Sequence, residues 1–282
     1  MVLVLGLSVA MAEERQDRLA TPAEQYKAIL KEYQDARADL AKAKTDEERK
    51  KIIERRDKLP PRFLELAENN PKDPIAADAL IEMVWFGMPG RDRAIVLLQR
   101  DHVRSDRLRQ VHQQTAFGSP RAVTLMQQIA HGFRKEDETL LRSVLEMNPH
   151  RDIQALACLA LAQFHITRLQ RLDLVKQRPE LRKPYEAVFG KDYLKEIQER
   201  DRAKLVQEAE VLFERAAEKY ADVKFPSGGT VGEKAKTSLY GIRDLIVGKK
   251  APDIDGEDQD GNRFKLSDYA GKVVLLYFWH QF

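Results

Sequence analysis

The sequence has a single cysteine, Cys158, among 282 residues, and this scarcity excludes a disulfide bond within the chain. It also has no block of lysine and arginine, and its net charge of +3 is spread along the chain. Aromatic residues make up only 7% of the sequence and are rarely interleaved with basic ones. A nucleic-acid partner is therefore disfavoured.

The chain also lacks an apolar run that could cross a membrane. Residues 1–12, MVLVLGLSVAMA, are uncharged and mostly apolar, but the run is too short for a bilayer and acidic and basic residues follow it at once. The ending Ala10-Met11-Ala12 is typical of the small-x-small cleavage site of a secretory signal. We expect a signal peptide at residues 1–12, no stable membrane span, and an exported protein of the periplasm or cell envelope.

Motifs for metals and phosphates are missing as well. The histidines show no H-E-x-x-H pattern and no paired Cys/His spacing, so neither a metal nor another cofactor is expected; they are His102, His112, His131, His150, His165 and His280. Residues 228–234, GGTVGEK, superficially suggest a phosphate loop, but they lack a Gly-Lys-Ser/Thr ending and follow no expected strand. We interpret this stretch as a linker.

Cys158 lies within ALACLALA, the interior of an expected helix. A cysteine in such surroundings usually behaves as a small apolar residue, and burial raises the pKa of a thiol and lowers its reactivity. We expect Cys158 to be buried and structural. The sequence therefore offers no catalytic, cofactor-binding or metal-binding residue.

The chain is rich in apolar residues, at 43%, and in charged residues, at 33%, which fits a globular protein with highly charged helices. Thr21-Pro22-Ala23-Glu24 combines an N-cap, a proline at the first helical position and a capping glutamate, which predicts a helix to about Lys44. Thr45 to Glu48 repeats the capping pattern and begins a second helix, interrupted near Pro60-Pro61 and ending at Asn69. We predict a helical hairpin over residues 21–69.

Residues 70–246 favour an irregular α-helical repeat domain. Similar apolar residues recur at the same offsets after Pro71 and after Pro149, and residues 209–220 resemble the second helix of a tetratricopeptide unit. The fold class is therefore predicted to be mainly α. The expected helices are Asp73–Phe86, Arg91–Val103, Ser119–Phe133, Lys135–Met147, Asp152 to about Val175, and Val231–Leu245.

The stretch from Val247 onwards changes character. Residues 256–261 predict a solvated turn, and Arg263–Leu266 alternates polar and apolar residues as a short half-buried strand does. Ser267-Asp268 can cap a brief helical turn. Residues 273–279, VVLLYFW, form an apolar run rich in β-branched and aromatic residues, which predicts a strand covered on both faces.

This stretch resembles the opening of the redoxin branch of the thioredoxin-like superfamily, which includes the alkyl hydroperoxide reductase and thiol-specific antioxidant proteins and the TlpA-like thiol reductases. The matching residues are Gly248, Ala251-Pro252-Asp253, Asp260-Gly261, Leu266–Tyr269, Gly271-Lys272, Val273–Leu276 and Phe278-Trp279. The resemblance implies that residues 247–282 are the truncated start of a thioredoxin-like α/β domain. It also implies thiol-disulfide oxidoreductase or antioxidant activity for the family.

In that family the strand is followed by Trp-Cys-x-x-Cys or by a single peroxidatic cysteine, whereas Trp279 is followed here by His280-Gln281-Phe282. The family's thiolate chemistry therefore has no residue to carry it in this chain, and we expect the chain as given to be inactive. The alternative is a secreted helical-repeat module that binds protein partners and retains a redoxin remnant. The redox substrate and the oligomeric state are left open by the sequence.

Overall fold

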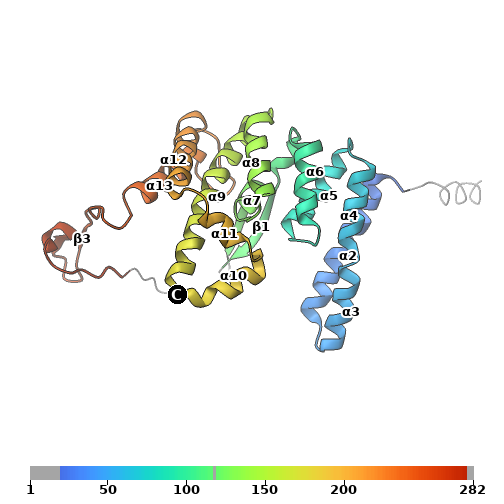
Figure 1. Cartoon of the computed structure of the whole chain (residues 1–282), viewed down its shortest axis with the longest axis horizontal. Coiled ribbons are helices and arrows are strands. Elements are labelled where there is room, and N and C mark those ends of the chain that lie inside the picture. Colours follow the sequence, from blue (N-terminus) through green and yellow to red (C-terminus); the bar gives the residue numbers. More distant parts are fainter. Residues whose placement is uncertain (1–19, 117–118, 278–282) are drawn as a thin grey trace, which may run out of the picture.

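The computed structural model describes residues 20–116 and 119–277, and these residues are mainly α-helical (Figure 1). The expected signal peptide at residues 1–12 lies outside the described residues, as do Trp279 and His280. Within residues 20–116 and 119–277, no helix is both long and apolar enough to cross a membrane.

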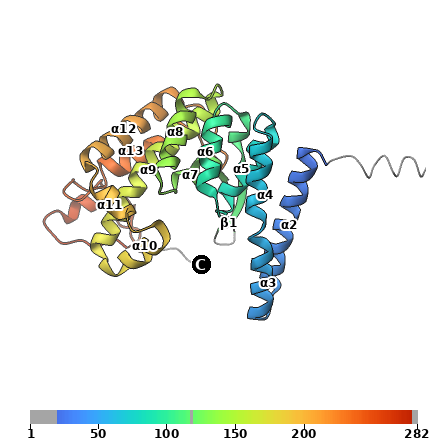
Figure 2. The ribbon, with the colours of Figure 1, turned by 45° about the vertical axis from the view of Figure 1, so that its right-hand side comes forward.

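The first three described helices form an arm. Helices α2 (Pro22–Lys42) and α3 (Asp46–Arg56) each begin with a complete capping box, at Thr21 and Thr45, as predicted. Helix α4 (Leu59–Asn69) carries the proline pair in its first turn, which confirms the predicted break between helices. Figure 2 shows α2 and α4 side by side with α3 at the far end of the arm. No residue of α3 is buried.

The remaining long helices form a curved row in which each packs against the next (Figures 1 and 2). One hydrophobic core runs through this row and into the arm, from Ile29 to Ala235, because each helix buries apolar residues against neighbours on both sides. The division into repeat units stays a prediction. The helices of the row are α5 (Pro74–Trp85), α6 (Arg91–His102), α8 (Lys135–Met147), α9 (Arg151–Gln177), α12 (Arg202–Lys219) and α13 (Val231–Arg243).

The prediction of a helix over Ser119–Phe133 is wrong in its first part. Strands β1 (Val111–Ala116) and β2 (Ser119–Thr124) form an antiparallel pair, and only then does helix α7 (Leu125–Ala130) begin. Pro120 biases the residue before it away from the helical region, and β-branched residues at the end of β2 favour a strand. Thr124 ends β2 and caps α7 through a capping box with Gln127, so the real helix start lies in the middle of the predicted one.

Two short helices follow α9 that the sequence did not indicate, α10 (Arg182–Phe189) and α11 (Tyr193–Gln198). They close a second, smaller core against the end of α9, in which Tyr193, Leu194 and Ile197 are buried. Phe189 packs edge-on against Phe133 with ring centroids 4.9 Å apart, which anchors α10 to the loop before α8.

The chain after α13 leads to a small hairpin. Strands β3 (Asp255–Glu257) and β4 (Arg263–Lys265) pair antiparallel around the predicted turn, and a single 3-10 turn, η3 (Leu266–Tyr269), follows as expected. The predicted strand Val273–Trp279 is wrong for its described part. Residues 273–277 pair with no strand of the described chain, because the two described sheets consist of β1–β2 and β3–β4.

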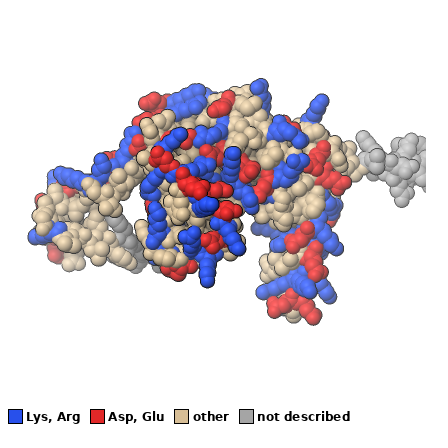
Figure 3. All heavy atoms as spheres, viewed as in Figure 1, with Lys and Arg blue, Asp and Glu red and all other residues tan. Residues whose placement is uncertain are grey.

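The charged residues of the helices lie mainly at the surface. Figure 3 shows lysine and arginine interspersed with aspartate and glutamate over the face in view. Many of them are paired, as in Arg55–Asp39 at 2.6 Å and Arg202–Asp173 at 2.7 Å. Exposed pairs of this kind contribute on the order of 0 to 1 kcal/mol each, so the core carries most of the stability.

Candidate functional site

The hairpin near the C-terminal end is held together by two aspartates. The carboxylate of Asp258 accepts hydrogen bonds from the backbone N–H groups of Asp260 (2.9 Å) and Asn262 (2.8 Å), which closes the turn. Gly261 takes φ +81° in this turn, a conformation that favours glycine. The turn residues of the redoxin resemblance therefore have a structural reason for their identity.

Asp253 ties the start of this segment to its end. Its carboxylate accepts from both the N–H and the hydroxyl of Ser267, each at 2.8 Å, and these hydrogen bonds lower the pKa of the Asp253 carboxyl. Beside them, the N–H of Leu266 donates to the carbonyl of Ile254 at 2.9 Å. The segment is thus a locally bonded unit, and Figure 1 shows it beyond α13, apart from the helices.

The apolar run after this unit is open to solvent on both faces. Relative exposure alternates along the run, at 103% for Val273, 42% for Val274, 91% for Leu275, 47% for Leu276 and 81% for Tyr277. A period of two is that of an extended chain with two distinct faces. The run therefore has the alternation of a strand but forms none, since neighbours that would pair with it and cover it are lacking among the described residues.

Comparison with known proteins confirms the resemblance that these residues suggested. Residues 247–282 match the AhpC/TSA family, so the C-terminal segment is a redoxin-like, thioredoxin-related fragment. Peroxiredoxin Bcp of Bacillus subtilis (strain 168) is 46% identical to this chain over 35 residues, which are 12% of this chain and 22% of that protein. The chain therefore spans less than a quarter of the curated relative that it matches. No solved structure gives a significant match.

Cys158 is buried, as predicted. It is 0% exposed in α9, and its thiol donates to the backbone carbonyl of Leu212 in α12 at 3.2 Å. Burial raises the pKa of the Cys158 thiol to about 11, so almost none of it is thiolate at neutral pH. Cys158 packs α9 against α12 and is unsuited to thiol-disulfide exchange.

The histidines are scattered over separate elements. His165 is fully buried in α9, where burial lowers its pKa to about 4, and burial also lowers the pKa of His102 in α6. His150 precedes the first turn of α9. Among the described residues, no group of three or more His, Cys, Asp and Glu side chains is positioned to hold a metal ion.

A buried carboxylate, which the sequence analysis did not single out, joins α2, α5 and β1. Glu82 is only 8% exposed; its Oε1 accepts from the Tyr26 hydroxyl at 3.3 Å, and its Oε2 has no hydrogen-bond partner among the described residues. Burial, with a smaller contribution from the charge of Asp78, raises the pKa of Glu82 to about 7. The His112 ring stacks on the Trp85 ring with their centroids 4.2 Å apart, and its Nε2 lies 4.0 Å from Oε1 of Glu82. In the sequence, the signal for this buried site is the pair Asp78 and Glu82, two carboxylates four residues apart in an otherwise apolar helix.

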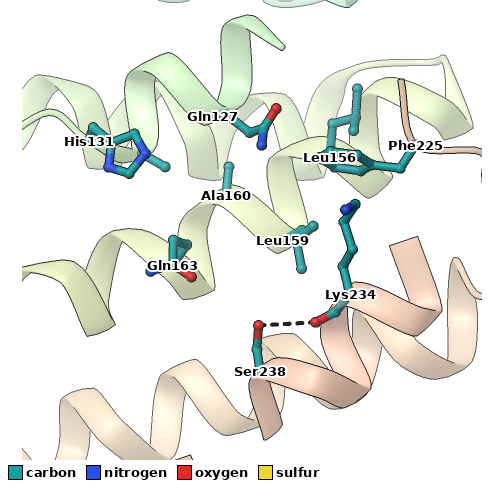
Figure 4. Close-up of a pocket in the computed structure, with 10 residues that line it drawn as sticks. Gln127, His131, Leu156, Leu159, Ala160, Gln163, Phe225, Lys234 and Ser238 are labelled. Carbon is teal, nitrogen blue, oxygen red and sulfur yellow. Dashed lines mark hydrogen bonds between the residues drawn. The ribbon is translucent and has the colours of Figure 1, made fainter. Parts of the chain in front are cut away.

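A cavity of about 270 Å³ opens between α7, α9 and α13 (Figure 4). Its wall includes Leu156 and Leu159 of α9, Gln127 of α7, Phe225, and Lys234 of α13.

Lys234 belongs to the glycine-rich stretch 228–234. That stretch forms a turn and then the capping box of α13 at Thr230, which fits its interpretation as a connection and not as a phosphate loop.

Proposed function

We propose that the protein is an exported thiol-disulfide oxidoreductase or antioxidant of the redoxin type, with a helical domain preceding its redox domain. The observation that carries this proposal is the C-terminal segment. It matches the AhpC/TSA family over residues 247–282, and its locally bonded hairpin leads into an apolar run with two open faces.

The open run supports the proposal because it has the composition of a sheet interior. Burying a large apolar side chain contributes on the order of 1.5 to 3 kcal/mol, and here Val273, Leu275 and Tyr277 gain almost none of it. A buried parallel strand is covered on both faces. The remaining strands and helices of a redoxin domain would supply that cover.

The chemistry of the proposal requires a reactive thiolate. Cys158 does not supply one, because it is buried in α9 with its pKa raised to about 11. We therefore propose that the chain of residues 1–282 is inactive in thiol exchange by itself. The active thiol of the functional protein would follow the apolar run, as in the family.

A chimera tests this function directly. The stretch of Peroxiredoxin Bcp that aligns with this chain is replaced by the corresponding residues of this chain, and peroxide consumption is compared with that of Peroxiredoxin Bcp. We expect a folded chimera that keeps activity within about tenfold, since the segment supplies the same strand. A matched chimera with Val274→Asp and Leu276→Asp is expected to lose it, because two charges enter the sheet interior. An unfolded or inactive first chimera would contradict the redoxin assignment.

The second candidate function is a secreted helical module that binds proteins and retains an inactive redoxin remnant. The observation that favours it is the arm of α2, α3 and α4, which projects from the row of helices and whose α3 buries no residue (Figure 2). Failure of the chimera, combined with a native transcript that encodes no further cysteine, would favour this module over the oxidoreductase.

Export is part of both candidates and has its own test. The apolar residues 1–12 end in Ala-x-Ala, which supports cleavage after Ala12. Intact mass of the protein from the periplasm of a secreting host is expected to show the chain beginning at Glu13. Recovery of chains that retain Met1 from the cytosol alone would contradict export.

A further inference from the structure

The cavity between α7, α9 and α13 combines an apolar wall with polar groups, and neither the redoxin segment nor the buried cysteine uses it. Leu156 and Ala160 of α9 are buried at the wall, and Leu159 beside them is half-buried. The Phe225 ring, 4% exposed, closes one end. An apolar wall of this kind, in a small concave space, favours the apolar body of a small molecule.

Lys234 provides a positive charge at the same end. Its ammonium lies 4.5 Å from the centroid of the Phe225 ring, and in the described part of the chain it makes no ion pair with a carboxylate. The residue is half-buried, so its charge is partly removed from water without a counter-ion. An anionic group bound in the cavity would pair with this ammonium through a charge-assisted hydrogen bond.

Gln127 adds a neutral donor on the opposite wall. Its Oε1 accepts from the N–H of Thr124 at 2.9 Å, which fixes the side chain. The amide nitrogen is thereby left without a hydrogen bond within the described residues. Figure 4 shows that nitrogen directed toward the space above Ala160, with Lys234 rising from α13 on the other side. The two donors thus face one space from helices that are far apart in the sequence.

We propose that this cavity binds a small organic monocarboxylate, with the carboxylate between Lys234 and Gln127 and the apolar body against Leu156 and Leu159. An inorganic anion would leave the apolar wall uncovered, and a neutral hydrocarbon would leave the ammonium unpaired. The volume of about 270 Å³ limits the ligand to a small molecule. This site does not depend on the redoxin function.

Titration of the full chain with hexanoate tests the proposal, with binding followed by calorimetry and by NMR shifts of the cavity residues. We expect saturable binding of hexanoate. Hexanamide, which has the same body without the charge, should bind at least about tenfold more weakly, because it loses the charge-assisted bond to Lys234.

Variants locate the binding. Lys234→Met keeps the length of the side chain and should weaken hexanoate binding at least about tenfold, whereas Lys236→Met, on the exposed face of the same helix, should leave it unchanged. Ala160→Leu places a larger side chain in the cavity and should abolish binding. Thermal unfolding of each variant checks that the fold is kept.

Several results would overturn the proposal. These are no saturable binding of hexanoate, equal affinity for hexanoate and hexanamide, or equal loss in Lys234→Met and Lys236→Met. If Lys234→Met or Ala160→Leu lowers the melting temperature, the comparison of hexanoate with hexanamide on the unmodified chain decides alone.

Discussion

At the scale of single residues, the buried Glu82 makes the stability of the fold depend on pH. Its pKa is raised from 4.5 to about 7, mainly by burial, so between those pH values the folded protein holds a proton that the unfolded chain has released. The contribution of Glu82 to stability therefore falls as pH rises from about 4.5 to about 7, and this loss is complete above that. Burial lowers the pKa values of His165, His102 and His112, which contribute the opposite trend.

Glu82→Gln removes this loss, because the amide carries no charge to bury. We expect the variant to be more stable than the unmodified protein at about pH 8, by on the order of 1 to 3 kcal/mol, and nearly equal to it at about pH 4. Urea unfolding across this pH range measures the difference. Glu65→Gln, at an exposed position of α4, is the control and should keep the original pH profile. Parallel profiles for all three proteins would refute the role given to Glu82.

Cys158 gives a second prediction at this scale. Its thiol is 0% exposed and bonded to the carbonyl of Leu212, so a thiol reagent can reach it only when α9 and α12 separate. We expect the reaction to be at least about a hundredfold slower in buffer than in denaturant, where the helices are unfolded. The chain should also show no insulin-reducing activity. Comparable rates in the two solvents would mean that the thiol is accessible in the folded protein.

At the scale of elements, one buried carboxylate of α8 holds three parts of the chain together. Glu138 is 8% exposed and accepts from Arg142 of its own helix at 2.9 Å, from Arg168 of α9 at 3.3 Å and from Arg200 before α12 at 2.9 Å. Burial by itself raises the pKa of Glu138, but the hydrogen bonds from Arg142 and Arg200 outweigh it and leave the pKa lowered.

Glu138→Gln keeps the shape of this side chain and removes its charge. We expect a loss of about 2 to 4 kcal/mol in the free energy of unfolding, since the buried guanidinium of Arg168 loses its carboxylate partner. Chemical denaturation measures this loss. Glu146→Gln, exposed on the same helix, should change stability by less than about 0.5 kcal/mol. Similar small losses in both variants would show that the arginines are satisfied elsewhere.

The elements also show how far the sequence could predict the fold. Helices with local start signals were placed well, as at Thr21, Thr45 and the capping box of α13 at Thr230, because capping is decided within four residues. The strand pair β1–β2 is not predicted from the sequence, because it depends on how residues of two separate segments pair with each other. Residues 273–277 carry a strand pattern but form no sheet in the described chain, because a strand needs partners that its own sequence does not provide.

The candidate sites divide in the same way. The redoxin segment could be predicted because its turn, its glycine and its Asp253–Ser267 bonds all lie within a short stretch. The cavity could not be predicted, since Gln127 and Lys234 come together only when α7 and α13 pack on α9. No local sequence pattern indicates that these two side chains meet. The glycine-rich turn before α13 superficially suggests a phosphate loop instead.

At the scale of the whole molecule, the chain consists of a helical body with one continuous core and a C-terminal segment outside it. The core ends at Ala235, and no residue from 244 to 277 is buried. Val247 is fully exposed, and Lys249 and Lys250 in the connection are exposed as well. The segment therefore contributes almost nothing to the stability of the helices, and its connection is accessible to proteases.

Limited proteolysis with trypsin tests this organisation. We expect the first cleavage at Lys249 or Lys250, and a resulting helical body whose melting temperature matches that of the intact chain within about 1 °C, because no core contact is lost. The matched variant Lys249→Gln with Lys250→Gln should resist this first cut while it unfolds at the same temperature. First cleavage within the arm of α2 to α4, or a fall of several degrees after the cut, would show that the segment packs on the helices. In that case the apolar run at residues 273–277 would be covered by this chain itself, which would contradict the proposal that other elements of a redoxin domain cover it.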